Sequence, residues 1–147
     1  MARLARQGAL IFTATLFAIS GCAEKEPTAA EAGETLKRHI TELMKRSQAL
    51  NVEVTDPGGR DVPCGEDRAK RTYAAVGQDA EPHSDANGLN GLLVGALSSV
   101  ASYQITEDPG NAPIKLASEM HRTKLIFEST EDGQLKVRGE TECLPSS

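Results

Sequence analysis

The richest concentration of chemically capable side chains in this chain is an acidic loop. Three carboxylates surround one histidine in the stretch Asp79-Ala80-Glu81-Pro82-His83-Ser84-Asp85. Oxygen ligands at alternate positions suit Ca²⁺, and one histidine with carboxylates suits Zn²⁺. The spacing lacks the glycine and the terminal glutamate of an EF-hand loop, and a proline interrupts it. We therefore expect a solvated loop, with Asp79, Glu81, His83 and Asp85 as weak metal candidates.

The other two histidines are interpreted as surface residues. His39 stands beside Arg38 in a helical segment, and His121 precedes Arg122 near the start of a strand. Sequence separation says nothing about proximity, so a metal-binding pair of these histidines stays open but has no positive support.

Familiar catalytic signatures are missing from the sequence. It contains no nucleophile elbow, no Ser-x-x-Lys pair, no His-Glu-x-x-His helix, no dinucleotide fingerprint and no phosphate-binding loop. We expect a protein that is not an enzyme and holds no cofactor.

The first 22 residues have the layout of a secretory leader. Arg3 and Arg6 precede an apolar run of eleven residues, Ala9 to Ile19. This run is too short to span a bilayer and is typical of a signal peptide. It closes on Ile19-Ser20-Gly21-Cys22.

That closing box resembles the lipobox of bacterial lipoproteins, and the whole chain resembles the small secreted lipoproteins of actinobacteria, many of which have no assigned role. The resemblance implies that Cys22 becomes the first mature residue and carries lipid. The expected organisation is a signal peptide over 1–21, a lipidated tether over 22–30 and one domain over 31–147. The domain would face outside the cytoplasm, tethered to the cell membrane.

Lipid on Cys22 would leave two cysteines, Cys64 and Cys143. Pairing is the default in an oxidising compartment. The closed loop of roughly 80 residues would contribute about 4–5 kcal/mol in the chain-entropy model. A redox pair or thiolate metal site has less support, because the spacing is no Cys-x-x-Cys and no histidine stands near either residue. We expect a structural disulfide.

The mature chain would be acidic and poor in aromatics. Removing the leader leaves fourteen cationic and twenty-one anionic side chains, a formal charge of −7. This charge argues against nucleic acid and against a polybasic grip on anionic lipid. Only Tyr73, Tyr103 and Phe127 remain as aromatics, so a large aromatic-lined pocket is not expected.

Two helical stripes alternate with strand patterns along the domain. The first stripe comprises Leu36, Ile40, Leu43, Met44 and Leu50; the second comprises Leu89, Leu93, Ala96, Leu97 and Val100. Strand patterns cover 52–54, 62–64, 71–76, 103–106, 114–117, 124–129 and 135–141, with turn signals between them.

These elements predict an α+β fold in the order α-β-β-α-β-β-β. The expected sheet is antiparallel, has about five strands and is covered by two helices on one face. Asp56-Pro57-Gly58 and Asp108-Pro109-Gly110 lie 52 positions apart, and Arg71-Thr72 and Arg122-Thr123 lie 51 apart. They suggest a duplicated αββ unit, with chance similarity as the alternative.

Small residues make a smooth ridge on the second helix at Gly91, Gly95 and Ser99. The segment is too short to be a transmembrane dimer helix. We expect these glycines to admit the sheet closely, so that alanine there lowers stability. The alternative is an exposed binding surface for a partner helix.

Two function classes remain open on this evidence. The favoured one is a noncatalytic binding or accessory module for another envelope protein. The other is a carrier or sensor of a small ligand or divalent cation, with the acidic loop as its first suspect.

The lipobox gives a direct test at Cys22. Stable membrane attachment generally needs two anchoring signals, which lipoprotein processing would supply as acyl chains. We expect Cys22→Ser to release the protein or leave its precursor uncleaved, measured by membrane fractionation and mass spectrometry. A variant that fractionates with membranes in the parent's mature form would contradict the lipoprotein interpretation.

Overall fold

The computed structural model describes residues 25–81, 85–110 and 113–146. Its first element is helix α1 (Ala29–Arg46), which begins in a capping box. The backbone N–H of Glu31 donates to Thr28 Oγ1, and the Thr28 N–H donates back to the Glu31 carboxylate, which satisfies two otherwise orphaned donors. The last two residues of the segment predicted as a tether over 22–30 form the start of this helix.

The apolar stripe of α1 is confirmed except at its end. Leu36, Ile40, Leu43 and Met44 are buried, whereas Leu50 lies in the next strand and is 51% exposed. The helix stops at Arg46, and Gln48 takes a positive φ of 56° in the connection that follows.

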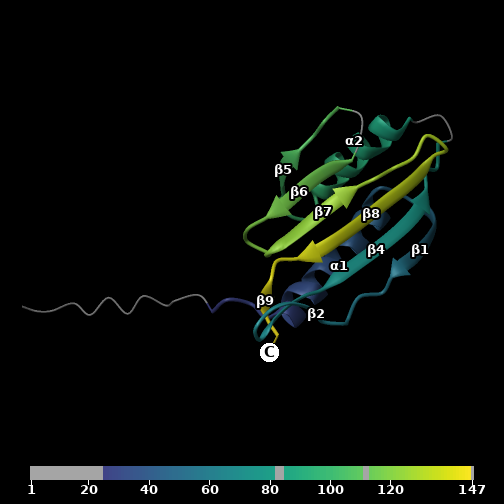
Figure 1. Ribbon diagram of the computed structural model, residues 1–147. Coiled ribbons are helices and arrows are strands. Elements are labelled where there is room, and N and C mark those ends of the chain that lie inside the picture. Colours follow the sequence, from purple (N-terminus) through teal and green to yellow (C-terminus); the bar gives the residue numbers. More distant parts are fainter. Residues whose placement is uncertain (1–24, 82–84, 111–112, 147) are drawn as a thin grey trace, which may run out of the picture.

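A six-stranded antiparallel sheet forms the main layer (Figure 1). Its spatial order is β1-β4-β8-β7-β6-β5. The strands are β1 (Leu50–Asp56), β4 (Thr72–Gln78), β5 (Gln104–Glu107), β6 (Ile114–Ser118), β7 (Thr123–Phe127) and β8 (Gln134–Thr141). Helices α1 and α2 (Ala86–Leu97) lie together on one face of it. The α+β class and the one-sided helix layer are therefore as predicted.

The number and order of strands differ from the prediction. The main sheet has six strands rather than about five, and a second small sheet has the order β2-β3-β9. Its strands are β2 (Val62–Gly65), β3 (Arg68–Lys70) and β9 (Leu144–Pro145). The predicted order has five strands, whereas the described residues form nine. The seven strand patterns of the sequence correspond to all of these except β3 and β9, because strands of three and two residues carry too few side chains to show a period.

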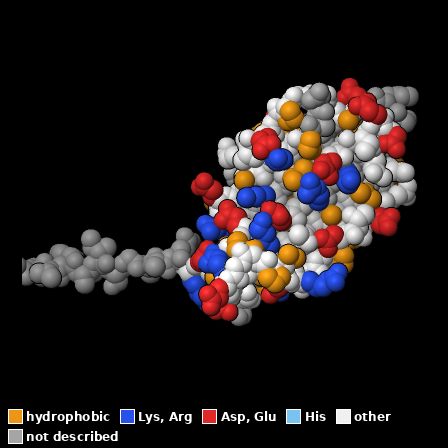
Figure 2. All heavy atoms as spheres, viewed as in Figure 1, with side chains coloured by type: hydrophobic (Ala, Val, Ile, Leu, Met, Phe, Trp, Pro, Cys, Tyr) orange, Lys and Arg blue, Asp and Glu red, His pale blue; other side chains and the backbone are white. Residues whose placement is uncertain are grey.

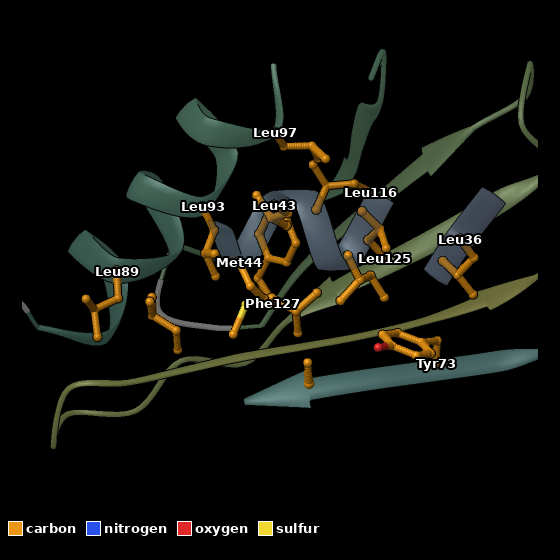
Figure 3. Packing of buried hydrophobic residues seen from close by; sticks show 14 residues of the cluster. Leu36, Leu43, Met44, Tyr73, Leu89, Leu93, Leu97, Leu116, Leu125 and Phe127 are labelled. Atoms are coloured by element: carbon orange, nitrogen blue, oxygen red, sulfur yellow. The ribbon is translucent and has the colours of Figure 1, made fainter. Parts of the chain in front are cut away.

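The core fills the space between the helices and the main sheet (Figure 3). Leucines of α1 and α2 meet Leu125, Phe127, Leu135 and Val137 of β7 and β8, all fully buried. Gly139 allows the closest approach, because a Cβ there would lie 2.6 Å from a methyl carbon of Leu36. A small-residue strand position thus brings α1 down onto the centre of the sheet.

Both Asp-Pro-Gly stretches form the same turn. The Gly58 N–H donates to Asp56 Oδ1 at 2.9 Å, and the Gly110 N–H donates to Asp108 Oδ1 at 3.0 Å. The two turns follow β1 and β5, which are the opposite edges of the sheet. Each glycine has a positive φ, 67° and 82°, which explains the residue type.

The predicted disulfide is confirmed. Cys64 in β2 is bonded to Cys143, which precedes β9, with the two Cα atoms 6.0 Å apart. The disulfide links the two edges of the small sheet, at β2 and β9. Beside it lies a buried cluster of Ala29, Ala32, Ala69 and Leu144. Among the described residues, no helix is both long and apolar enough to cross a membrane.

Neighbouring leucines of α2 test the packing of the core. Leu93 is fully buried and Leu92 is 39% exposed. We expect Leu93→Ala to lower the free energy of unfolding by about 2–5 kcal/mol, through lost burial and a residual cavity. Leu92→Ala is the matched control and should change it by about 0.5 kcal/mol or less. Denaturant unfolding of protein expressed from residue 23 measures both, and equal effects would contradict the packing.

Candidate functional site

The face of the main sheet opposite the helices is hollowed into a groove of about 650 Å³. Small and apolar side chains of the central strands make its floor, including Ala74, Ala117 and Ile126. Charged side chains stand around them: Asp56, Glu107, Lys115, Lys124, Arg138 and Glu140. Figure 2 shows this face, with basic and acidic side chains interleaved and hydrophobic atoms between them. We call this region the open-face groove.

Most of the charged side chains around the groove are engaged in ion pairs. Lys115 Nζ lies 2.8 Å from a Glu107 oxygen, and Lys70 Nζ lies 3.1 Å from a Glu140 oxygen. Arg138 donates two hydrogen bonds to Glu128, at 3.0 and 3.1 Å. These hydrogen bonds lower the pKa of Glu128 and raise that of Arg138. The charged side chains around the groove therefore form a lattice of neutralised charges, in which neither sign predominates.

Asp56 is satisfied in a different way. Its carboxylate accepts a 2.6 Å hydrogen bond from the Thr72 hydroxyl and another from the Gly58 N–H. Both hydrogen bonds lower the pKa of Asp56, and the bond from the Thr72 hydroxyl has the larger effect. The edge of the groove at β1 thus carries a negative charge at neutral pH, with one hydrogen bond to each oxygen of Asp56.

Lys124 is the exception in this lattice. It lies in β7, in register with Glu140 of β8 and Ala117 of β6. Within the described parts of the chain, no carboxylate lies within ion-pair distance of its ammonium group. An exposed cation beside a small-residue floor can receive an anionic group of a ligand.

A second polar cluster joins α1 to the β6–β7 turn. His39 Nδ1 is 3.0 Å from the Tyr103 hydroxyl, which is 2.7 Å from Thr123 Oγ1. The His39 ring packs edge-to-face on His121, with centroids 4.7 Å apart. The cluster connects three segments that are distant in sequence, and burial raises the pKa of Tyr103.

The prediction that His39 is a surface residue is wrong. Its exposure is only 6%, because it follows Leu36 by three positions and precedes Leu43 by four, which places it on the buried side of the helix. Burial first, then His121 and Arg38, lower its pKa to about 4. His121, predicted at the surface, is half-buried against it.

The histidine pair is used in packing and hydrogen bonding. The two rings meet edge-to-face, and His39 Nδ1 is paired with the Tyr103 hydroxyl. Among the described residues, no three histidine, cysteine or carboxylate side chains gather as a metal set. The cluster's evident role is to hold the β6–β7 turn on α1.

The candidate metal ligands of the acidic loop have different structural roles. Asp85 caps α2, because its Oδ1 accepts the Gly88 N–H at 2.7 Å. The Asp79 N–H donates to the carbonyl of Gly133, and Glu81 is exposed. Asp79 and Glu81 border a smaller hollow of about 460 Å³ beside α2. His83 lies outside the described residues.

The glycine ridge faces solvent, contrary to the expectation that it admits the sheet. A Cβ at Gly91 or Gly95 would meet no heavy atom within 4 Å, and Ser99 is exposed. The reason is angular: each glycine is two positions from buried Leu93, which is about 200° around the helix. The expected loss of stability on Gly→Ala substitution therefore has no structural basis.

Comparison with known proteins gives no relative. No protein-family model, no curated protein and no solved structure matches this chain.

His39 makes the stability of the fold depend on pH. Its pKa is about 4 when folded and 6.5 in the reference state, so the unfolded chain takes up the proton first as pH falls. The stabilisation is complete above about pH 6.5 and lost towards pH 4. We expect a loss on the order of 2–3 kcal/mol from this group.

His39→Gln should flatten this part of the pH profile, measured by denaturant unfolding between pH 4 and 7. His121→Gln is the control and should keep most of the slope, because burial is the largest cause of the low pKa. An unchanged slope in His39→Gln would contradict the assignment.

Proposed function

We propose that this protein is a noncatalytic binding module, anchored by lipid on Cys22 and facing outside the cytoplasm. In this proposal, the open-face groove binds an acidic segment of another envelope protein. The observation that carries the proposal is one face of the six-stranded sheet, which neither of the two described helices covers.

The chemistry around the groove favours binding over catalysis. A nucleophile needs a base within hydrogen-bond reach, and a general acid or base needs a pKa near the working pH. The carboxylates Asp56 and Glu128 instead have lowered pKa values. The Cys64 and Cys143 sulfurs are bonded to each other. These side chains are suited to holding a ligand in register.

The charge lattice favours a ligand with acidic side chains. Lys115, Arg138 and Lys70 already have carboxylate partners, and each oxygen of Asp56 accepts a hydrogen bond. Lys124 is left to attract an incoming carboxylate, while Ala74, Ala117 and Ile126 offer a shallow apolar floor. An extended segment that alternates apolar and acidic residues matches both features.

Lys124→Glu tests this proposal on the soluble domain. The probe is a labelled twelve-residue peptide that alternates alanine or valine with glutamate, and its binding is followed by fluorescence anisotropy. A hydrogen bond to a charged group contributes about 1.5–3 kcal/mol, so its loss should weaken binding roughly tenfold or more.

Lys37→Glu is the matched control, because Lys37 is an exposed lysine on α1, away from the groove. It makes the same change in net charge and should leave binding near the parent's. Equal losses in the two variants would reduce the effect to overall charge and contradict a site at Lys124. Equal binding of a lysine-containing peptide would contradict the acidic ligand.

A further inference from the structure

We propose that the β6–β7 turn is the surface of the domain that rests on the membrane, with Met120 inserted among the lipids. This inference rests on the proposed lipid anchor at Cys22. It adds an orientation: one pole of the fold faces the bilayer and the opposite pole points away from it.

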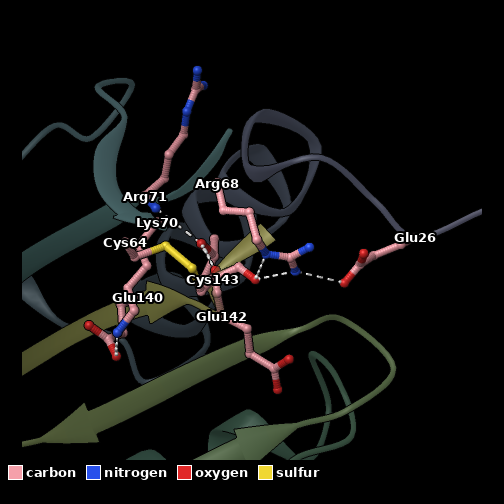
Figure 4. Close-up of a disulfide and its surroundings, with 9 residues drawn as sticks. Glu26, Cys64, Arg68, Lys70, Arg71, Glu140, Glu142 and Cys143 are labelled. Atoms are coloured by element: carbon pink, nitrogen blue, oxygen red, sulfur yellow. Dashed lines mark hydrogen bonds and ion pairs between the residues drawn. A yellow bond between two sulfur atoms is a disulfide. The ribbon is translucent and has the colours of Figure 1, made fainter. Parts of the chain in front are cut away.

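The first step is where the chain enters the fold. Glu26 Oε1 lies 3.1 Å from the guanidinium of Arg68 in β3 and 3.1 Å from that of Arg122 in the β6–β7 turn. Figure 4 shows Glu26 reaching Arg68 beside the disulfide. Two residues later, Thr28 caps α1. The amino-terminal end of the domain is thus bound to this turn.

The second step is the reach of the covalent tether. Cys22 and Glu26 are four positions apart, and four residues span at most about 14 Å when fully extended. A lipid on Cys22 therefore keeps the β6–β7 turn close to the headgroups. The carboxyl-terminal end of α1 is about 27 Å from its amino-terminal end, because the helix has eighteen residues with a rise of about 1.5 Å each.

The third step is that the turn is fixed in place. The Arg122 N–H donates to the Glu119 carbonyl at 3.3 Å, and the Arg122 carbonyl accepts from the Glu142 N–H at 2.8 Å. Arg122 adopts a positive φ of 54°, a region that favours glycine. Its side chain, held by Glu26 and Glu142, accounts for an arginine there.

Met120 is the residue that this rigid turn presents. It is 80% exposed, more than any other large hydrophobic residue in the described chain. Its neighbour His121 packs on His39 and Arg122 is held by ion pairs, so both anchor the turn while the methionine projects from it. An unbranched, apolar side chain suits the irregular boundary between headgroups and acyl chains.

The contact should be apolar rather than electrostatic. Arg68 and Arg122 share Glu26, and Arg122 also pairs with Glu142 at 2.9 Å. The two positive charges are thus matched by two negative ones. We expect insertion to be insensitive to the fraction of anionic lipid and to salt.

The absence of tryptophan from the sequence makes a clean probe possible. Met120→Trp introduces a single tryptophan at the turn, in the full, lipidated protein reconstituted into phosphatidylcholine vesicles. We expect its emission to shift to shorter wavelength and to be quenched by brominated acyl chains. Leu92→Trp is the matched control, because Leu92 borders the hollow beside Arg46 at the far end of α1, and it should show neither effect.

The outcomes separate this inference from the anchor on which it rests. If both variants float with vesicles but Met120→Trp is quenched no more than Leu92→Trp, the orientation is overturned and the anchor stands. If neither variant floats, both proposals are overturned. If quenching requires anionic lipid, the apolar contact is overturned.

Oxidation of the native side chains gives a readout without substitution. A water-soluble oxidant should convert Met120 to its sulfoxide more slowly in vesicle-bound protein than in protein that lacks Cys22. Met44, which is 1% exposed, is the internal reference. Equal rates at Met120 in the two forms would overturn the inference.

Discussion

The rest of this structure depends on burying the helix layer against one face of the main sheet. Leucines of α1 and α2 pack on Leu125, Phe127, Leu135 and Val137 of the two central strands. Two helices suffice for one face of six strands, and a side chain on the other face must then tolerate water. The strands obey this alternation, since Lys136 and Arg138 point away from the buried Leu135 and Val137.

One-sided burial also shapes the two poles of the domain. The small sheet and the disulfide lie beside the amino-terminal end of α1, together with the entry of the chain at Glu26. The His39 cluster then fastens the β6–β7 turn to the same helix. Helix α1 therefore serves two surfaces: its leucines support the groove from behind, and its beginning and His39 hold the proposed membrane-facing turn.

Local patterns in the sequence predicted the local structure well. The helical stripes as far as Met44 and Leu97, the Asp-Pro-Gly turns and the cysteine pair follow from spacing and residue type. Leu50 and Val100, the last members of the two predicted stripes, lie beyond the helix ends. The position of β8 does not, because the last long strand inserts between β4 and β7 through contacts distant in sequence. The open-face groove has the same origin, since its walls come from strands that only the topology makes neighbours.

Helical geometry explains the burial of His39 and the exposure of the two glycines. Helical spacing places His39 on the same side as Leu36 and Leu43. It also places Gly91 and Gly95 opposite Leu93. The burial of His39 and the exposure of the glycines could therefore be predicted from the sequence. The hydrogen-bonded chain from His39 through the Tyr103 hydroxyl to Thr123 could not be predicted in this way. Tyr103 and Thr123 follow His39 by 64 and 84 positions in the sequence, and no local pattern predicts a contact over such a separation.

Whether the uncovered face of the sheet is occupied in the cell envelope is the central question. The most direct measurement is the rate of lysine acetylation, read by mass spectrometry on intact cells and on the purified domain. The account predicts that Lys124 and Lys136 react more slowly in the envelope, while Lys37 and Lys45 on the outer side of α1 react equally in both. Equal rates at Lys124 in the two settings would contradict a bound partner on this face.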